Sequence, residues 1–304
     1  MRLALKIDVD TERGTRLGVP SLLADVRRAG VPATFFLSLG PDNTGRAITR
    51  IFRPGFLKKV GRTNVVDLYG WRTLLNGTLL PAPHIAQRHA SLMRLITACG
   101  LEAGIHCHDH YRWQDHVLAM APAEVQAELA AARREFLRVF GAEATCAAAP
   151  GWQANATTRD AYDRAGLLYA SDTRGEQPYF PRDGGHTFSV LEIPTTLPTL
   201  DELIGRPEYP DHRIIPHLLS LLSPDRLNVF TLHAELEGMK KRAFFVEWLH
   251  VLRARHVEVV SLAQEARDCL ARRHQVPVCA LEQAPVDGRS GSLAVQGATV
   301  LSGV

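Results

Sequence analysis

Two aspartates stand one residue apart near the N-terminus, directly after an apolar run. Asp8 and Asp10 flank Val9, and residues 3–8 are predicted to form a buried strand. Side chains on a strand alternate between its two faces, so both carboxylates should point to the same side. Two like charges this close repel, and burial increases the cost. The pair predicts a compensating cation, arginine or shared proton. The alternative is a turn-capping Asp10 beside an exposed Asp8.

A second polar cluster is rich in histidine. His106 ends a short strand predicted over residues 102–106, His108 and His110 follow it, and His116 comes soon after. The spacing of His106 and His110 brings two imidazoles together on one helical turn or tight loop. Two imidazoles and one carboxylate form a common open catalytic site for a divalent metal, with positions left for water and substrate. A loop of solvated histidines is the alternative interpretation.

Three further candidates also follow predicted strands. Trp152 comes after strand 145–149, Asp172 ends strand 168–172, and His233 comes after strand 227–232. A single histidine after an apolar strand is more often a satisfied core residue than a catalyst. We expect His233 to act only if its strand lies beside the first one.

Strands and helices alternate along most of the chain, which indicates parallel βαβ units and an α/β fold. A barrel of about seven such units would collect the polar clusters at the carboxyl ends of its strands. The predicted strands are residues 3–8, 33–39, 102–106, 145–149, 168–172, 188–193 and 227–232. The predicted helices are residues 20–29, 85–99, 122–140, 157–165, 211–222, 240–255 and 262–273.

The C-terminal residues change character. From about Val276 the chain is rich in small residues and lacks helical or strand periodicity. We predict one catalytic domain over residues 1–275 and a flexible tail over residues 276–304.

The composition excludes several classes of protein. Of 304 residues, 46% are apolar and 22% charged, which allows a sizeable core, and the net charge of +3 does not indicate a nucleic-acid binder. Five cysteines without a CxxC pair favour neither a disulfide framework nor a cysteine zinc site. The N-terminal apolar run is too short for a signal peptide, and no stretch approaches the roughly 20 residues of a membrane span. We therefore expect a cytoplasmic protein that does not cross the membrane.

Residues 46–72 combine cationic and apolar side chains, with a local charge of about +6. This mixture is typical of an interfacial segment on an anionic leaflet. The alternative is an amphipathic helix and loop packed on the barrel. The basic residues are Arg46, Arg50, Arg53, Lys58, Lys59, Arg62 and Arg72, against Asp67 alone.

Taken in order, these clusters resemble the five motifs of the polysaccharide deacetylase family, also called the NodB-homology family. The matching residues are Asp8 with Asp10, His106 with His110, residues 149–152 (Ala-Pro-Gly-Trp), Asp172, and Leu232 with His233. The resemblance implies a distorted (β/α)7 barrel.

The same resemblance implies a role for each site residue. Asp10, His106 and His110 would bind a divalent metal such as zinc, cobalt, manganese or iron. Asp8 would be the general base, and His233 would protonate the departing amine. Asp172 would orient His233 or hold it in its charged form.

One departure from the family pattern concerns the third motif. Many members carry an arginine there that contacts the base aspartate, and residues 149–152 contain none. Arg13 or Arg174 is a candidate to supply that charge.

Several runs outside the motifs resemble the bacterial undecaprenyl-phosphate 4-deoxy-4-formamido-L-arabinose deformylases. These runs are residues 7–20, 40–45, 68–71, 193–199, 202–205 and 233–238. The resemblance implies removal of formate from a formamido sugar on a polyprenyl phosphate, for lipid A modification and resistance to cationic antimicrobial peptides. It also implies peripheral attachment to the cytoplasmic face of the inner membrane.

The expected substrate-binding residues are Arg13, Trp71, Trp152 and Arg174. The rival interpretations are an N-deacetylase of another glycan, a hydrolase of a small soluble amide, and a non-enzymatic protein that retains the fold.

Overall fold

The structure is a computed structural model, and it describes residues 1–47 and 70–300. Most of the cationic and apolar segment predicted over residues 46–72 lies outside these ranges. Among the described residues, every helix is too short or too polar to span a bilayer.

Within these residues, the largest sheet has eight strands, and all of its strand pairs are parallel. Seven of them follow the order β9-β1-β2-β3-β4-β5-β8, and β10 lies beside the first half of β1. The strands are β1 (Arg2–Val9), β2 (Thr34–Ser38), β3 (Glu102–Cys107), β4 (Cys146–Ala147), β5 (Tyr169–Ala170), β8 (Leu191–Glu192), β9 (Leu227–His233) and β10 (Glu258–Val260).

The sheet curves into an irregular barrel. After β8 the chain turns toward β9, where the backbone N–H groups of Thr196 and Leu197 both donate to Val229 O at 3.2 Å. The predicted α/β class and the distorted (β/α)7 barrel are confirmed.

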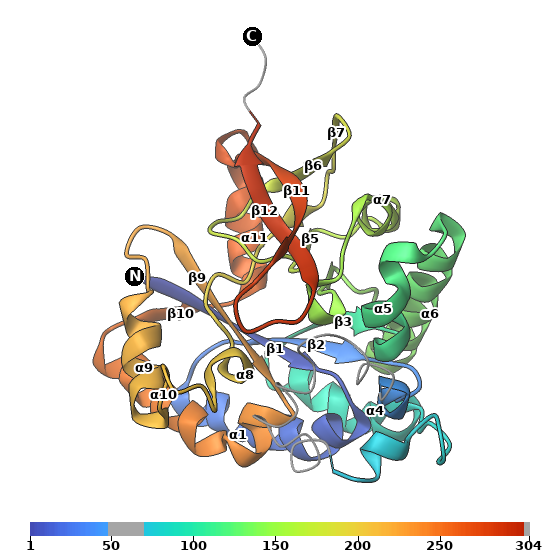
Figure 1. Cartoon of the computed structure of the whole chain (residues 1–304), viewed down its shortest axis with the longest axis horizontal. Coiled ribbons are helices and arrows are strands. Elements are labelled where there is room, and N and C mark those ends of the chain that lie inside the picture. The colour runs from blue at the N-terminus through green and yellow to red at the C-terminus, as the bar shows by residue number, and fades with distance from the viewer. Residues whose placement is uncertain (48–69, 301–304) are drawn as a thin grey trace.

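Helices cover the outside of the sheet (Figure 1). Several end where a glycine adopts a left-handed conformation, as Gly141 and Gly166 do after α6 and α7. The helices are α1 (Val19–Ala29), α4 (Ile85–Ala98), α5 (His110–His116), α6 (Pro122–Phe140), α7 (Ala156–Ala165), α8 (Leu200–Leu203), α9 (Asp211–Ser220), α10 (Arg242–Ala254) and α11 (Leu262–Ala271).

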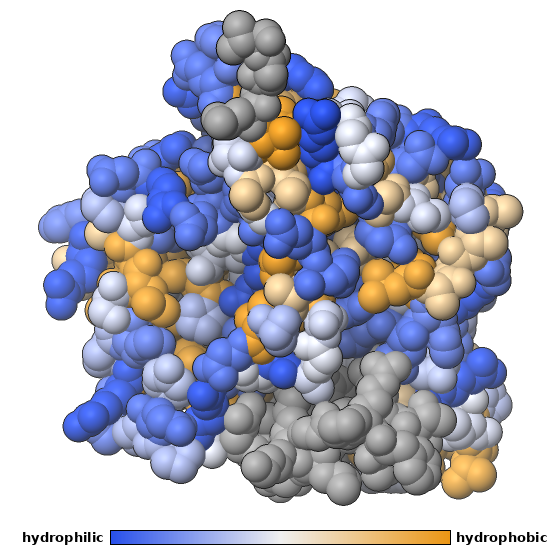
Figure 2. All heavy atoms as spheres, turned by 45° about the horizontal axis from the view of Figure 1, so that its top comes forward, coloured by the Kyte–Doolittle hydropathy of each residue, from blue (hydrophilic) through white to orange (hydrophobic). Residues whose placement is uncertain are grey.

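Side-chain alternation on β1 separates two layers of core. Leu3, Leu5, Ile7 and Val9 belong to the apolar cluster that includes residues of the surrounding helices. Ala4 belongs to a second cluster, which lies inside the barrel. Lys6, Asp8 and Asp10 continue the inner face of Ala4, so the strand period aims two carboxylates and one ammonium into the barrel. The face of the molecule in Figure 2 is mainly hydrophilic, with apolar residues in separate groups.

Residues 278–299 form a hairpin, so the prediction of a flexible tail from residue 276 to residue 304 is wrong for this part of the chain. Strands β11 (Val278–Pro285) and β12 (Ser292–Thr299) pair in antiparallel fashion. The first of them also pairs in parallel with β6 (Phe180–Asp183), which pairs with β7 (His186–Thr187). Figure 1 shows the hairpin in red, running down toward the barrel strands. Its small residues hide the strand pattern, and the pairing with β6 is a tertiary interaction that local sequence cannot reveal.

Two irregular π-type turns meet beside the site. The first, η1 (Gly14–Gly18), follows β1, and the second, η6 (Leu236–Lys240), follows β9. A Cβ added at Gly238 would stand 2.7–2.9 Å from backbone atoms of Gly18. These atoms belong to the backbone of Gly18, so rotation of a side chain cannot relieve the clash.

We therefore expect Gly238→Ala to destabilise the protein by about 1–3 kcal/mol, as overpacking does elsewhere. The measurement is urea unfolding followed by far-UV circular dichroism. Gly297→Ala is the matched control, because the three atoms nearest to a Cβ there all belong to the Glu282 side chain, which can rotate away. It should change the free energy of unfolding by less than about 0.5 kcal/mol. Equal losses in the two variants would contradict this account of the turns.

Candidate metal centre and active site

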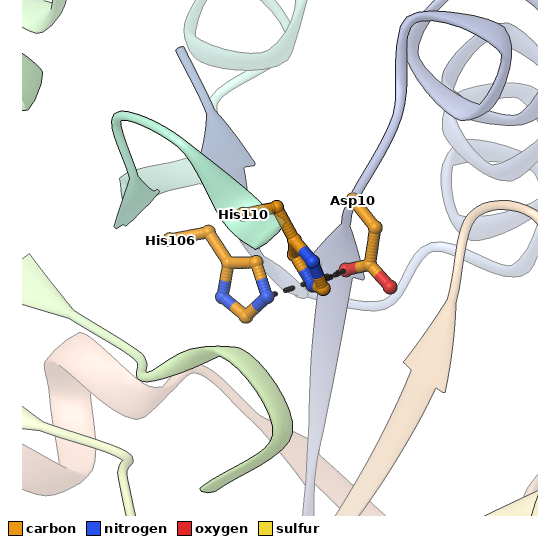
Figure 3. A group of neighbouring side chains, drawn as sticks. All are labelled: Asp10, His106 and His110. Carbon is orange, nitrogen blue, oxygen red and sulfur yellow. Dashed lines mark ion pairs between the residues drawn. The ribbon is translucent and has the colours of Figure 1, made fainter. Parts of the chain in front are cut away.

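Asp10, His106 and His110 converge at the mouth of the barrel (Figure 3). Asp10 follows β1, His106 lies on β3, and His110 is the first residue of α5. The Nε2 atoms of His106 and His110 lie 3.2 and 3.4 Å from Asp10 Oδ1. One ligand atom from each residue falls within 4.8 Å of the others. The structure thus brings together the three residues that the sequence predicts as metal ligands.

The orientation of each imidazole is fixed by its surroundings. His106 Nδ1 lies 2.7 Å from Ala148 O, and a carbonyl can only accept, so Nδ1 carries the hydrogen. Its Nε2, on the side of Asp10, is therefore the ring nitrogen available to a metal, as in metal-binding histidines whose other ring nitrogen donates to a carbonyl. The position of His110 is set by the start of its helix, where Asp109 caps the backbone N–H of Arg112 at 3.0 Å.

The centre has the electrostatics of a cation site. Asp8 Oδ1 and Asp10 Oδ1 are buried and receive no hydrogen bond from the described residues. Burial alone would raise the pKa of the Asp10 carboxyl, but His110 and His106 outweigh it and hold that pKa well below its usual range. Burial lowers the pKa of His106, yet the Asp8 and Asp10 carboxylates raise it overall. Two imidazoles, one carboxylate and orphaned oxygens fit a divalent metal.

Lys6 is the cation beside Asp8, and the sequence analysis missed it. Its Nζ lies 3.4 Å from Asp8 Oδ2 and donates to Ser171 O at 2.8 Å. The side chain is fully buried. Arg174, a candidate for this task, instead donates to Glu202 and to Leu197 O. The alternation of side chains along β1 could have predicted this contact, since Lys6 lies two residues before Asp8 on the same face of the strand.

Two buried glutamates after β9 hold the ends of β1 and β9, and they were also missed. Glu235 Oε1 accepts hydrogen bonds from the backbone N–H groups of Asp10 and Thr11 and from the Thr11 hydroxyl. Glu237 accepts from His233 N at 2.9 Å. Burial, together with the charge of Asp10, raises the pKa of Glu235 to about 8. These carboxyls fix the backbone positions from which Asp10 and His233 project.

His233 ends β9, which lies directly beside β1, with His233 in register with Asp8. This neighbourhood is the condition that the sequence analysis set for a functional His233. The acid nearest to its ring is Asp201, whose Oδ1 lies 3.9 Å from His233 Nδ1. Asp201 is in α8 and belongs to none of the motifs recognised in the sequence.

Asp172 has a different set of partners from the one predicted. Its Oδ1 accepts from Ala149 N at 2.7 Å, and its Oδ2 lies 3.4 Å from Arg159 Nη1. The same Arg159 nitrogen donates to Glu192 at 2.7 Å. All three side chains are fully buried. Asp172 thus links the end of β5 to the loop after β4, where the third motif lies.

Trp152 forms a wall of the barrel mouth from within. It is 1% exposed and donates from Nε1 to Thr195 Oγ1. Three cations lie over its ring: Lys6 at 5.2 Å, Arg174 at 5.1 Å and Arg289 at 4.5 Å from the centroid. Its φ of +55° is rare for a bulky residue, which indicates that its position is enforced by its neighbours.

A cationic pocket begins two residues after Asp10. It has a volume of about 640 Å³, and its described lining includes both Arg13 and Trp71. Trp71 is 65% exposed. The other charged residues of this described lining are Glu12, Arg16, Arg72 and Arg88. Four arginines against one carboxylate make this pocket suited to an anionic group.

Comparison with known proteins agrees with this geometry. The family model for polysaccharide deacetylase matches residues 8–170. The chain is 36% identical to a probable 4-deoxy-4-formamido-L-arabinose-phosphoundecaprenol deformylase of Shewanella sediminis (strain HAW-EB3), covering 98% of this chain and 96% of that protein. A protein of Wigglesworthia glossinidia brevipalpis with the same name is 29% identical, over 93% of this chain and 98% of that protein.

Two crystal structures share the fold. A putative polysaccharide deacetylase from Mycobacterium smegmatis has a TM-score of 0.64 at 19% identity, with 94% of each chain covered. A probable polysaccharide deacetylase from Pseudomonas aeruginosa PAO1 has a TM-score of 0.61 at 18% identity, with 90% of this chain and 91% of that chain covered. From the family model and the full-length relative, the chain belongs to the polysaccharide deacetylase family.

Proposed function

We propose that this protein is a metal-dependent deformylase that hydrolyses undecaprenyl-phosphate 4-deoxy-4-formamido-L-arabinose. The products are formate and the amino sugar on its lipid carrier, which serves lipid A modification and resistance to cationic antimicrobial peptides. The observation that carries the proposal is the match of nearly the whole chain to a deformylase, with a metal-type site at the barrel mouth. Residues that resemble the deformylases outside the motifs, including Arg13 and Trp71, line the cationic pocket.

The three ligands would be Asp10, His106 and His110. A divalent metal bound there supplies Lewis-acid chemistry, which polarises a carbonyl and eases the deprotonation of water. Zinc, cobalt and manganese all suit two imidazoles and one carboxylate.

The remaining residues handle protons. Asp8, held by Lys6, takes a proton from the attacking water, whose oxygen adds to the formyl carbon. His233 lies on the neighbouring strand, in register with Asp8, and gives a proton to the sugar nitrogen as the carbon–nitrogen bond breaks. Asp201, rather than Asp172, is placed to orient the ring of His233. Formate and a free amine result.

The cationic pocket is proposed to bind the phosphate that links sugar and lipid. Arginine recognises phosphate through paired hydrogen bonds, and Arg13, Arg72 and Arg88 line one cavity. The exposed ring of Trp71 offers an apolar face to the sugar or the first isoprene units. Trp152 and Arg174 are proposed to line the mouth of the barrel. Buried contacts hold both side chains in place.

Peripheral attachment to an anionic membrane completes the proposal, because a polyprenyl phosphate is met at a bilayer surface. The support is the sequence of residues 46–72, with its charge of about +6 and interleaved apolar residues.

The central test is incubation of the purified protein with the formamido-sugar lipid and zinc, cobalt or manganese, followed by quantification of formate. Asp8→Asn should lower kcat by roughly 100- to 10,000-fold while metal content stays near that of the unmodified protein. Asp10→Asn should lose metal. Metal loss in Asp8→Asn with retention in Asp10→Asn would reverse the two roles. Release of acetate but not formate from matched substrates would favour an N-deacetylase.

A second prediction concerns the cationic pocket. Removing one charge-assisted hydrogen bond costs about 1.5–3 kcal/mol, so Arg72→Gln or Arg88→Gln should raise KM roughly tenfold or more. The substrate is the formamido sugar linked to a short, water-soluble isoprenyl phosphate. The methyl glycoside of the same sugar lacks the phosphate and should show no such change. Arg164→Gln is the matched control, since that exposed arginine pairs with Asp160 on α7. Equal effects on both substrates would count against a phosphate site.

A third prediction concerns the membrane. The protein should cosediment with vesicles that contain anionic lipid, and binding should weaken as salt shortens the Debye length from about 10 Å at 0.1 M to about 3 Å at 1 M. Replacing Lys58 and Lys59 by glutamine should reduce binding, since each basic residue near the surface contributes about 1 kcal/mol. The same change at Arg253 and Arg255 is the control. Equal recovery with neutral and anionic vesicles would contradict the proposal.

A further inference from the structure

The C-terminal hairpin delivers its turn to the mouth of the barrel. Residues 286–291 connect β11 to β12, and Arg289 N closes the turn on Val286 O at 3.0 Å. A Cβ at Gly288 would stand 2.8–3.1 Å from Cβ, O and Cα of Glu202 in α8. Only a glycine therefore lets the turn approach α8 this closely. Asp287 adds an ion pair to Arg206 at 2.7 Å.

The side chain of Arg289 points inward from this turn and is 11% exposed. Its Nε donates to Glu202 Oε1 at 2.6 Å, and its Nη2 donates to Thr199 Oγ1 at 2.8 Å and to Asp201 Oδ1 at 3.1 Å. Its guanidinium also lies over the ring of Trp152. A planar fork with several partners in different directions has one permitted orientation, which a flexible lysine could not reproduce.

One of these partners leads to the chemistry. Asp201 Oδ1 accepts from Arg289 and from Thr199 Oγ1, and this same oxygen faces His233 Nδ1. Two donors thus fix the oxygen that stands nearest to the imidazole. The second partner, Trp152, meets the ring of His233 edge-on, with centroids 6.5 Å apart. Arg289 therefore contacts both residues that flank His233 on this side.

We propose that Arg289 is a positioning residue of the active site, which acts on His233 through Asp201, while its contact with Trp152 supports the same side of the ring. The hairpin would then be part of the catalytic centre and not an appended tail. This inference rests on the proposed function, since it assigns the affected step to the proton that His233 gives to the leaving amine. A purely structural alternative is that Arg289 only anchors the hairpin through Glu202.

The chain offers a matched control for that alternative. Arg206→Gln removes another hairpin anchor, the ion pair to Asp287. Within the described residues, Arg206 does not bond to Asp201. Arg289→Gln should lower kcat by roughly 10- to 100-fold, as misplacement of a catalytic group by about 1 Å does. KM and metal content should change by less than about threefold. Arg206→Gln should leave kcat within about twofold, and Arg289→Lys should restore only part of the loss.

A double-mutant cycle tests whether Arg289 acts on His233 through Asp201. If Arg289 acts through Asp201, then Arg289→Gln in an Asp201→Asn background should lower kcat by less than about threefold further. The same additional loss in both backgrounds would overturn the proposal, as would equal losses in Arg206→Gln and Arg289→Gln. Urea unfolding of each variant separates loss of fold from loss of position. If Arg289→Gln does not fold, the cycle is run with Arg289→Lys.

The assay also separates this inference from the proposed function. An unmodified protein that releases acetate but no formate refutes the deformylase, while the same variant series on the acetamide substrate still tests Arg289. An unmodified protein that releases formate, together with an unimpaired Arg289→Gln, refutes the positioning role alone.

Discussion

Asp8 and Asp10 are two carboxylates on the same face of one strand, and a pair of like charges at a largely buried site is stable only when positive groups surround it. Lys6 faces Asp8 from within the barrel, and the imidazoles of His106 and His110 face Asp10. The oxygens that remain without a hydrogen bond point to a metal as the missing positive charge. The neighbouring strands and loops are arranged to hold these groups in place.

The register of the parallel strands determines which charged groups stand next to one another. β1 pairs with β9 from Arg2 to Asp8, so Asp8 stands opposite His233, and the base and the acid of the proposed reaction lie on adjacent strands. The turns that follow the two strands are then held together by Glu235 and by the close approach of Gly238 to Gly18. Glu237 bonds His233 N within the second of these segments. Hydrogen bonds to the backbone therefore fix the places from which Asp10 and His233 project, and they leave these side chains little freedom.

The sequence predicts how side chains meet where the residues lie close together along the chain. The period of a strand places Asp8 and Asp10 on one face, and the spacing of His106 and His110 brings their rings together. It fails where partners are distant along the chain. Asp201 faces His233, but nothing near either residue in the sequence predicts this meeting. The hairpin over residues 278–299 is missed because its residues are small and its stability comes from β6 and from contacts with α8. Lys6 was within reach, since it obeys the same strand period as the aspartates.

The groups that sequence reasoning missed are mainly buried ions, and their energetics explain their use. A buried arginine with carboxylates gains little net stability, because desolvation offsets most of the Coulomb attraction. Arg159 between Asp172 and Glu192, and Arg289 between Glu202 and Asp201, are arrangements of this kind. Their benefit is a single geometry, since any other orientation leaves a buried charge without a partner. A hydrolase that must hold a base and an acid on opposite sides of one amide needs that uniqueness more than it needs additional stability. This explains why buried charges, in addition to the apolar contacts of residues such as Leu200 and Ala294, join the loop after β4, helix α8 and the hairpin to the mouth of the barrel.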